Sequence, residues 1–312
     1  MPFNAWDAKN KKWRSSKVLV PAIYKEFSDE LPSWITHATP ESGMTAYLYQ
    51  RLDPKLPRYT PNYGWESGVY LQFINDFYHN LPDLTIFVHA HAYEHNPDWP
   101  TWARCLKPTA TYAPLLYKFI ENRNMHVWLG QGTAVTYEQC FRDLLSIFDQ
   151  PIPFRRQLPW FSFYCCANFA VSRKQILKHT RPAYRRAHLK LGLQAVCHLG
   201  RPNYKELWSF RAKGQNKMPE APSTGKLGAV VFEHIQHMVI GGWKSDSKPL
   251  QQEGYCEQFQ VESVCPGSPC LADPTQWQCI ENASPHMGEK YLLCGRNATK
   301  LRLLHPGKKK GG

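Results

Sequence analysis

Residues 66–95 constrain the fold more than any other part of the chain, because they contain a complete predicted helix, a complete predicted strand and a group of polar residues where the strand ends. Apolar residues at the spacing of one helix face, within 70–77, predict an amphipathic helix. A Leu-Pro-Asp turn at 81–83 ends this helix, and an unbroken apolar run follows at 84–88. A strand of this kind is usually buried on both faces by helices. The segment therefore predicts an α/β layer architecture.

The rest of the chain supplies further elements for such a layer. Periodicity predicts helices at 112–122, 136–148 and 229–240, and apolar runs predict strands at 17–24 and 160–171. The expected fold is a mixed, mainly parallel sheet flanked by helices.

Composition divides the chain into three parts. Residues 1–16 form a polar N-terminal arm, and 17–245 hold the periodic elements of an α/β catalytic-like domain. Within the latter, a stretch rich in Pro, Gly and Lys at 200–228 predicts an exposed loop. Residues 246–312 are expected to be an irregular Cys-rich extension with a basic tail.

Cysteine usage points to an oxidising compartment. Five of the ten cysteines fall within the last sixty residues, where the CxxC spacing of zinc sites is absent. Five cysteines cannot all pair among themselves, so one must pair elsewhere or stay free. Two glycosylation sequons, at Asn282 and Asn297, lie in the same segment. These features favour a secreted glycoprotein with disulfides, in the Golgi lumen or outside the cell, although the N-terminus lacks the apolar core of a signal peptide.

The formal net charge of +13 favours an anionic partner. The basic residues of the protein are spread along the chain and form no nucleic-acid-binding motif, so no nucleic acid is expected as a partner. A membrane span is not expected either, because no apolar run approaches about 18 residues.

Histidines cluster where the 84–88 strand ends. His89 and His91 alternate, so both side chains project from one face of the strand. Ligands of open α/β sheets bind beyond the carboxyl ends of strands. With Glu94 or His95, the two histidines could hold a divalent metal or bind an anion directly. The alternative is one core histidine and one solvated histidine.

Two other pairs could carry chemistry. Glu233 and His237 stand four residues apart on a predicted helix, which fits a general base or equally a surface pair. Glu66 is a further candidate acid or base. Cys165 and Cys166 adjoin in an apolar run, which fits a thiol nucleophile or buried structural cysteines.

Several enzyme classes lose support because their motifs are missing. The chain has no GxGxxG, Walker loop, GxSxG or HExxH. Dinucleotide enzymes, P-loop enzymes, serine hydrolases and zincin proteases are therefore disfavoured.

The ordered series of these motifs resembles an uncharacterised eukaryotic family, a domain of unknown function seen mainly in fungi, oomycetes and algae. The resemblance covers roughly 17–242 and departs from the family at Gln236, where a Trp is usual. The shared motifs are a G-x-E-x-x-x-Y-L-x-x-I helix, LPD, F-x-H-x-H, C-x-x-F-x-V-S-R and E-x-x-x-H, matched here by Gly64, Glu66, Tyr70, Leu71, Ile74, Leu81, Pro82, Asp83, Phe87, His89, His91, Cys166, Phe169, Val171, Ser172, Arg173, Glu233 and His237.

The same order of elements is also similar, more faintly, to bacterial capsular-polysaccharide glycosyltransferases, whose α/β fold binds nucleotide-diphospho-sugars. That similarity implies that His89, His91 and Arg173 hold the donor diphosphate, directly or through Mn²⁺ or Mg²⁺. It also implies that Glu233 or Glu66 accepts the proton of the acceptor hydroxyl. The Asp-x-Asp metal motif common in that fold is missing here.

Three functions follow as hypotheses. The first is a glycosyltransferase with a nucleotide-sugar donor and a glycan or protein acceptor. The second is a metal-dependent hydrolase in which His89, His91, His95 and a carboxylate such as Glu94 bind Zn²⁺. The third is a non-enzymatic carbohydrate-binding cell-surface module, in which some of the eleven Trp and sixteen Tyr stack against sugars.

Overall fold

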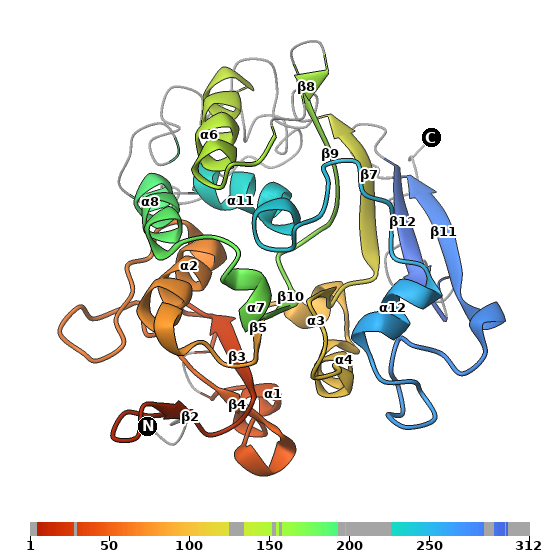
Figure 1. The fold of residues 1–312 in the computed structure, drawn as a ribbon, viewed down its shortest axis with the longest axis horizontal. Helices are drawn as coiled ribbons and strands as arrows, with labels where there is room; N and C mark the ends of the chain where they lie inside the picture. Colours follow the sequence, from red (N-terminus) through yellow and green to blue (C-terminus); the bar gives the residue numbers. More distant parts are fainter. Residues whose placement is uncertain are drawn as a thin grey trace, which may run out of the picture.

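The computed structural model describes residues 5–27, 30–124, 134–151, 154–155, 158–192, 197, 226–283, 290–296 and 298. Its central sheet has five strands in the order β4-β3-β5-β10-β6 (Figure 1). They are β3 (Lys17–Ala22), β4 (Met44–Ala46), β5 (Leu84–His89), β6 (Tyr112–Pro114) and β10 (Phe169–Ser172). β3 runs parallel to β4 and β5, whereas β10 is antiparallel to both of its neighbours. The predicted mixed α/β architecture is confirmed, but the expectation of a mainly parallel sheet is wrong, because two of the four strand pairings in this sheet are antiparallel.

The two central strands end together at one edge of the sheet. Ala22 of β3 is in register with His89 of β5, so the two strands end side by side. The interior of β3 is fully buried at Val18, Leu19 and Val20, as expected for an unbroken apolar strand covered on both faces.

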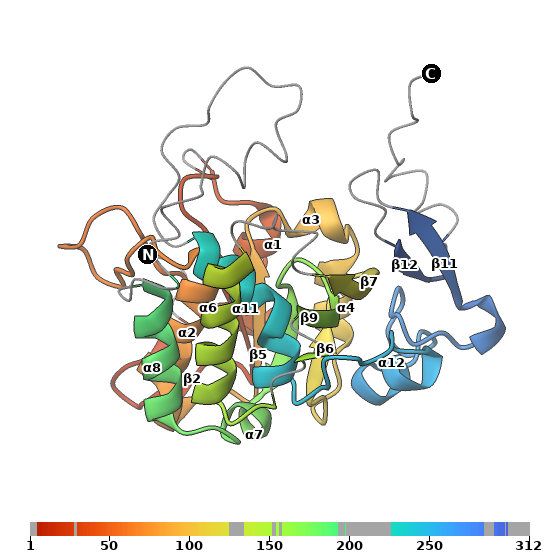
Figure 2. The same cartoon turned by 90° about the horizontal axis from the view of Figure 1, so that it is seen from above.

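Four long helices lie together on one side of the central sheet (Figure 2). They are α2 (Trp65–Phe77), α6 (Ala134–Ile147), α8 (Arg181–Gly192) and α11 (Lys226–Val239). α2 contacts α8 and α11, and α11 contacts α6. Of these helices, α2, α6 and α11 match helices predicted from the sequence. Shorter helices α1 (Ser33–Thr36), α3 (Ala92–His95), α4 (Trp99–Cys105) and α7 (Arg173–Ile176) connect the strands.

A second five-stranded sheet, in the order β11-β12-β7-β9-β8, is antiparallel throughout. Its strands are β7 (Lys118–Asn124), β8 (Phe154–Arg155), β9 (Leu158–Tyr164), β11 (Gln278–Ala283) and β12 (Lys290–Gly295). The helix predicted at 112–122 is wrong, because this segment forms β6 and β7. Its apolar residues also suit a strand, and hydrogen bonds to β9 and β12, distant in sequence, decide between the two.

The C-terminal extension is more regular than expected. It contains α12 (Gln252–Gln258) and the β11–β12 hairpin, and β12 pairs with β7 (Figure 1). The last strands of the chain therefore complete a sheet that the earlier part begins. Of the predicted loop at 200–228, residues 200–225 lie outside the described part, and the rest opens α11.

The N-terminal arm packs against the body of the protein. β1 (Trp6–Asp7) and β2 (Lys12–Trp13) form a hairpin. The rings of Trp6 and Trp13 lie 5.2 Å and 4.7 Å from that of Phe77 in α2. The prediction of a polar arm missed these two tryptophans, whose rings make the contact.

All ten cysteines are paired. The bonds are Cys105–Cys265, Cys140–Cys197, Cys165–Cys166, Cys256–Cys270 and Cys279–Cys294. The fifth C-terminal cysteine, Cys265, pairs outside its cluster, which is one of the two outcomes that the count allowed. Five disulfides are typical of proteins that fold in an oxidising environment.

The first sequon is buried. Asn282 is 8% exposed, and its side-chain amide donates a hydrogen bond to the Tyr291 hydroxyl over 2.9 Å. A glycan on this amide is incompatible with the folded β11–β12 hairpin. The second sequon, at Asn297, lies outside the described residues.

None of the helices in the described ranges combines the length and apolar character that a bilayer crossing requires.

Candidate functional site

A cavity of about 540 Å³ opens where β3 and β5 end. Ala22, His89 and Ala90 line it from these strand ends, and the first turn of α2 and the middle of α11 supply carboxyl groups. Its volume is within the range of small-molecule sites. Its position is the one that open α/β sheets use for ligands.

The entry into α2 sets the position of Glu66. Gly64 and Trp65 have left-handed φ angles of 63° and 45°, so the chain turns sharply before the first helical turn. A Cβ on Gly68 would lie 2.1 Å from the Tyr63 carbonyl oxygen. Only glycine lets the preceding loop lie this close to the helix. Loop and helix together bring Asn62, Trp65 and Glu66 to the cavity wall.

Two carboxyl groups lie near each other in the cavity. Glu66 comes from α2 and Glu233 from α11. Burial raises the pKa of Glu66 to about 7, and the negative charge of Glu233 contributes to that rise. The main-chain N–H of Cys166 donates a hydrogen bond to Oε1 of Glu233 over 2.7 Å. A donor of this kind favours the ionised form of the carboxylate that accepts from it.

Arg51 places a buried positive charge beside these carboxyls. Its side chain lines the cavity, and the residue is only 6% exposed. One terminal nitrogen donates to the Pro61 carbonyl over 3.2 Å, whereas Nε has no hydrogen-bond partner in the described part of the chain. Burial lowers the pKa of Arg51 to about 10, so the guanidinium stays charged at neutral pH.

His89 is neutral in this setting. Burial lowers its pKa to about 3, helped by His95 and His91. The main-chain N–H of His91 donates to Nδ1 of His89 over 3.1 Å, which places the ring proton on Nε2. His89 is therefore a hydrogen-bond donor rather than a cation. The expected role of His89 in binding a diphosphate stays a prediction, in which a neutral Nε2–H rather than a positive charge would contact the phosphate.

The predicted metal ligands are only partly brought together. His89, His91 and His95 all line the cavity, and the rings of His89 and His95 lie 4.9 Å apart. Glu94 is not among the lining residues. Its 70% exposed side chain lies 3.3 Å from Nδ1 of His91. Among the described residues, the group with three ligand atoms within 4.8 Å of one another is instead His95, Cys165 and Cys166.

Arg173 lies at the wrong end of the sheet for the predicted role. β10 is antiparallel to β5, so the residue after β10 lies beside the start of β5 rather than its histidine end. Figure 2 shows α7, which begins with Arg173, and α3 at opposite ends of the central sheet. Arg173 pairs with Asp83 over 2.7 Å.

His237 lies away from the cavity. It is one helical turn after Glu233, about 6 Å along the axis. The ring is 2% exposed and lies parallel to that of Phe163. Burial lowers its pKa to about 3. The predicted pair of carboxylate and imidazole is therefore not formed at one site, because Glu233 alone lines the cavity.

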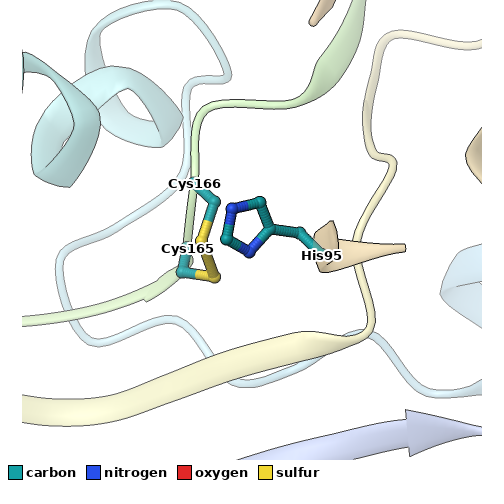
Figure 3. Close-up of side chains that lie close together, drawn as sticks. All are labelled: His95, Cys165 and Cys166. Atoms are coloured by element: carbon teal, nitrogen blue, oxygen red, sulfur yellow. A yellow bond between two sulfur atoms is a disulfide. The ribbon is translucent and has the colours of Figure 1, made fainter. Parts of the chain in front are cut away.

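Cys165 and Cys166 are bonded to each other, so neither is the free thiol of the nucleophile hypothesis. They occupy the turn between β9 and β10, and Cys166 lines the cavity. Figure 3 shows the His95 ring beside this disulfide.

Sequence reasoning missed several cavity residues. Arg51, Asn62 and Trp65 lie in or beside a loop rich in proline, where no periodicity indicates which side chains face inward. Tyr24 also lines the cavity and follows β3 closely. Tyr24, Asn62 and Trp65 lie close to the ends of elements that the sequence did predict, whereas Arg51 does not.

Comparison with known proteins gives one match. No curated protein and no solved structure matches the chain significantly. Neither comparison therefore supports a similarity to glycosyltransferases. The family match includes Arg51, Glu66 and the three cavity histidines, and it ends before Cys166 and Glu233. Over residues 22–107, the chain is similar to a family described as "Protein of unknown function (DUF3431)".

Proposed function

We propose that the cavity is the active site of an enzyme that transfers a glycosyl group from a nucleotide-sugar donor to a hydroxyl acceptor. One observation carries the proposal: two carboxyls line the same small-molecule cavity, Glu66 with a pKa raised to about 7 and Glu233 with a main-chain N–H bound to its Oε1. A carboxyl with a strongly raised pKa beside a second carboxyl in a cavity is typical of acid–base catalysis.

Glu233 is the base in this reaction. The N–H of Cys166 favours its carboxylate form, and the carboxylate accepts the proton of the acceptor hydroxyl. The acceptor oxygen then forms a bond to the anomeric carbon as the bond from that carbon to the donor phosphate oxygen breaks. Glu66, with its pKa of about 7, is protonated in a large fraction of molecules at neutral pH and donates a hydrogen bond to the sugar.

Arg51 and His89 support the departure of the leaving group. The Arg51 guanidinium supplies positive charge for the released phosphate oxygens, and its Nε can donate to them. Nε2 of neutral His89 adds a further donor. Donors fixed where negative charge develops contribute more in a buried cavity than in water.

Aromatic side chains suit a sugar ring. Tyr24 and Trp65 line the same cavity. Flat apolar faces beside hydrogen-bonding groups match the two sides of a pyranose. This composition supports a saccharide at the cavity, and the disulfides are compatible with a Golgi or extracellular setting.

The test is a transfer assay with a panel of nucleotide sugars and a mixture of glycan acceptors, with and without Mn²⁺. The assay measures released nucleoside diphosphate and the glycosylated product together. Glu233→Gln and Arg51→Gln should each abolish most of the product, whereas Arg173→Gln, at the far end of the sheet, should act like wild type. Absence of transfer from every donor would overturn the proposal.

Hydrolysis of glycosides is the second candidate. Among the described residues that line the cavity, Glu26, Glu66 and Glu233 supply three carboxyls, and Arg51 supplies one guanidinium. This excess of acid favours a neutral saccharide over a diphosphate, and two carboxyls flanking a bond are the usual means of glycoside hydrolysis. Aryl glycosides cleaved by wild type but not by Glu66→Gln would select this reaction over transfer.

The remaining hypotheses are outcomes of the same experiments. Sugar binding without turnover, unaffected by Glu66→Gln and Glu233→Gln, would favour a carbohydrate-binding module. A requirement for bound Zn²⁺, lost in His89→Ala with His91→Ala, would favour the metal-dependent hydrolase.

A further inference from the structure

The bond between Cys165 and Cys166 lies at the cavity wall beside an imidazole. Cys165 is buried, Cys166 is half-buried, and His95 approaches from the end of α3 (Figure 3). The two sulfur atoms and a ring nitrogen of His95 all lie within 4.8 Å of one another. Three ligand atoms from three side chains therefore converge on one point.

We propose that reduction of the Cys165–Cys166 disulfide creates a Zn²⁺ site formed by the two thiolates and His95. Two thiolates and one imidazole are a ligand set that zinc accepts, and three protein ligands leave a fourth position for water or a ligand. Because Cys166 lines the cavity, that position is accessible from it. The site differs from the histidine cluster predicted from the sequence.

The geometry needs only small adjustments. In a tetrahedral zinc site with bonds of about 2.0–2.3 Å, neighbouring ligand atoms lie about 3.3–3.8 Å apart. The present separations are at most 4.8 Å. The two sulfur atoms move apart once their bond is broken, and the His95 nitrogen moves inward by about 1 Å or slightly more.

The reduction is an exchange with a thiol reductant of the glutathione class. One thiolate attacks a cysteine sulfur, breaks the S–S bond and forms a mixed disulfide. A second thiolate of the reductant attacks the reductant sulfur of that mixed disulfide. This step forms the disulfide of the oxidised reductant and frees the second cysteine. The protein gains two electrons and two protons, and Zn²⁺ binding then releases the thiol protons.

This disulfide is well placed to be reduced without loss of the fold. It joins adjacent residues, so it closes the shortest loop of the five and constrains the unfolded chain least. In three of the other disulfides at least one cysteine is fully buried, namely Cys105, both Cys140 and Cys197, and Cys294. Access from the cavity favours attack at Cys166.

The experiment uses Co²⁺ as a spectroscopic substitute for Zn²⁺. The full chain is treated briefly with a thiol reductant, freed of it without oxygen, and titrated with Co²⁺. We expect a near-ultraviolet thiolate-to-cobalt absorption band at one equivalent in the reduced protein and none in the oxidised protein. Zn²⁺ should remove this band by displacement.

Three variants assign the ligands. Cys165→Ser with Cys166→Ser should lose the band, and His95→Gln should bind Co²⁺ more weakly. Cys279→Ser with Cys294→Ser is the matched control, because it removes another disulfide that has an exposed cysteine, and it should bind like wild type. A band that persists in the Cys165/Cys166 variant, or the same affinity in His95→Gln, would overturn the assignment.

A measurement on the wild type avoids dependence on folding of the variants. Zn²⁺ should protect Cys165 and Cys166 from alkylation in the reduced protein, as read by mass spectrometry of the peptides. Equal alkylation with and without Zn²⁺ would contradict the site. Neither result depends on whether the protein transfers sugars, so the two proposals fail separately.

Discussion

The main-chain N–H of Cys166 donates to Oε1 of Glu233 over 2.7 Å, which joins the turn between β9 and β10 to the middle of α11. Cys166 and Ala167 both have left-handed φ angles, of 72° and 48°. The conformation of this turn directs the N–H toward the cavity. The hydrogen bond to Glu233 thus depends on the conformation of a turn that contains the Cys165–Cys166 disulfide.

The five disulfides should contribute very differently to stability. Loss of Cys105–Cys265, which spans 160 residues, is expected to lower the free energy of unfolding by about 5 kcal/mol, because it constrains the largest loop. Loss of Cys165–Cys166 should cost about 1 kcal/mol on the same basis. Chemical denaturation of the paired Cys→Ser variants checks both values. A larger loss for the adjacent pair would show that it is a main structural bond.

The stability of the protein should depend on pH through Glu66. Its pKa is about 7 when folded and about 4.5 without the protein environment, so the folded state binds more protons between these values. Stability therefore decreases as pH rises from about 4.5 to about 7 and levels off above that range. The full effect is at most about 3 kcal/mol.

Glu66→Gln should remove this dependence, because glutamine does not titrate. Denaturant unfolding of wild type and variant at several pH values measures the difference between the two curves. Glu253→Gln, an exposed carboxyl on α12, is the control and should keep the wild-type dependence. Parallel curves for wild type and Glu66→Gln would contradict the raised pKa.

Gly68→Ala should damage the cavity from one turn inside α2. Its methyl group would overlap the Tyr63 carbonyl oxygen, so the loop carrying Asn62 must move. We expect a loss of about 1–3 kcal/mol in stability and weaker ligand binding. Thermal unfolding and ligand titration measure the two effects.

Gly254→Ala is the matched control, also at a helical glycine. Its methyl group would lie too close only to Cδ2 of Leu250, 2.8 Å away, and this end of the side chain can rotate aside. A change of less than about 1 kcal/mol is expected there. Equal effects at the two glycines would mean that the contact with Tyr63 does not matter.

The elements with strong local signals could be predicted from the sequence. The unbroken apolar run of β5 indicates a strand buried on both faces. The apolar stripes of α2, α6 and α11 indicate helices buried on one face. β7 could not be predicted, because its residues suit a helix equally well and its partners in β9 and β12 lie far away in sequence.

At the candidate site, too, residues on predictable elements were found and the others were not. Glu66, Glu233 and the three histidines were found because they lie at the ends or on the faces of predictable elements. Arg173 was misplaced because the direction of β10 was unknown. Arg51 was missed because a loop has no periodicity that shows which side chains face inward.

The central claim is that Glu66 and Glu233 form one acid–base pair, and the titration of the Glu66 carboxyl tests it most directly. Carbon NMR of side-chain-labelled protein, assigned with Glu66→Gln, measures the pKa of this group in the folded state. We predict a pKa of about 7 that falls toward the usual glutamate range in Glu233→Gln, since the neighbouring charge is then removed. A Glu66 pKa near 4.5 in the wild type, or one unaffected by Glu233→Gln, would contradict the account.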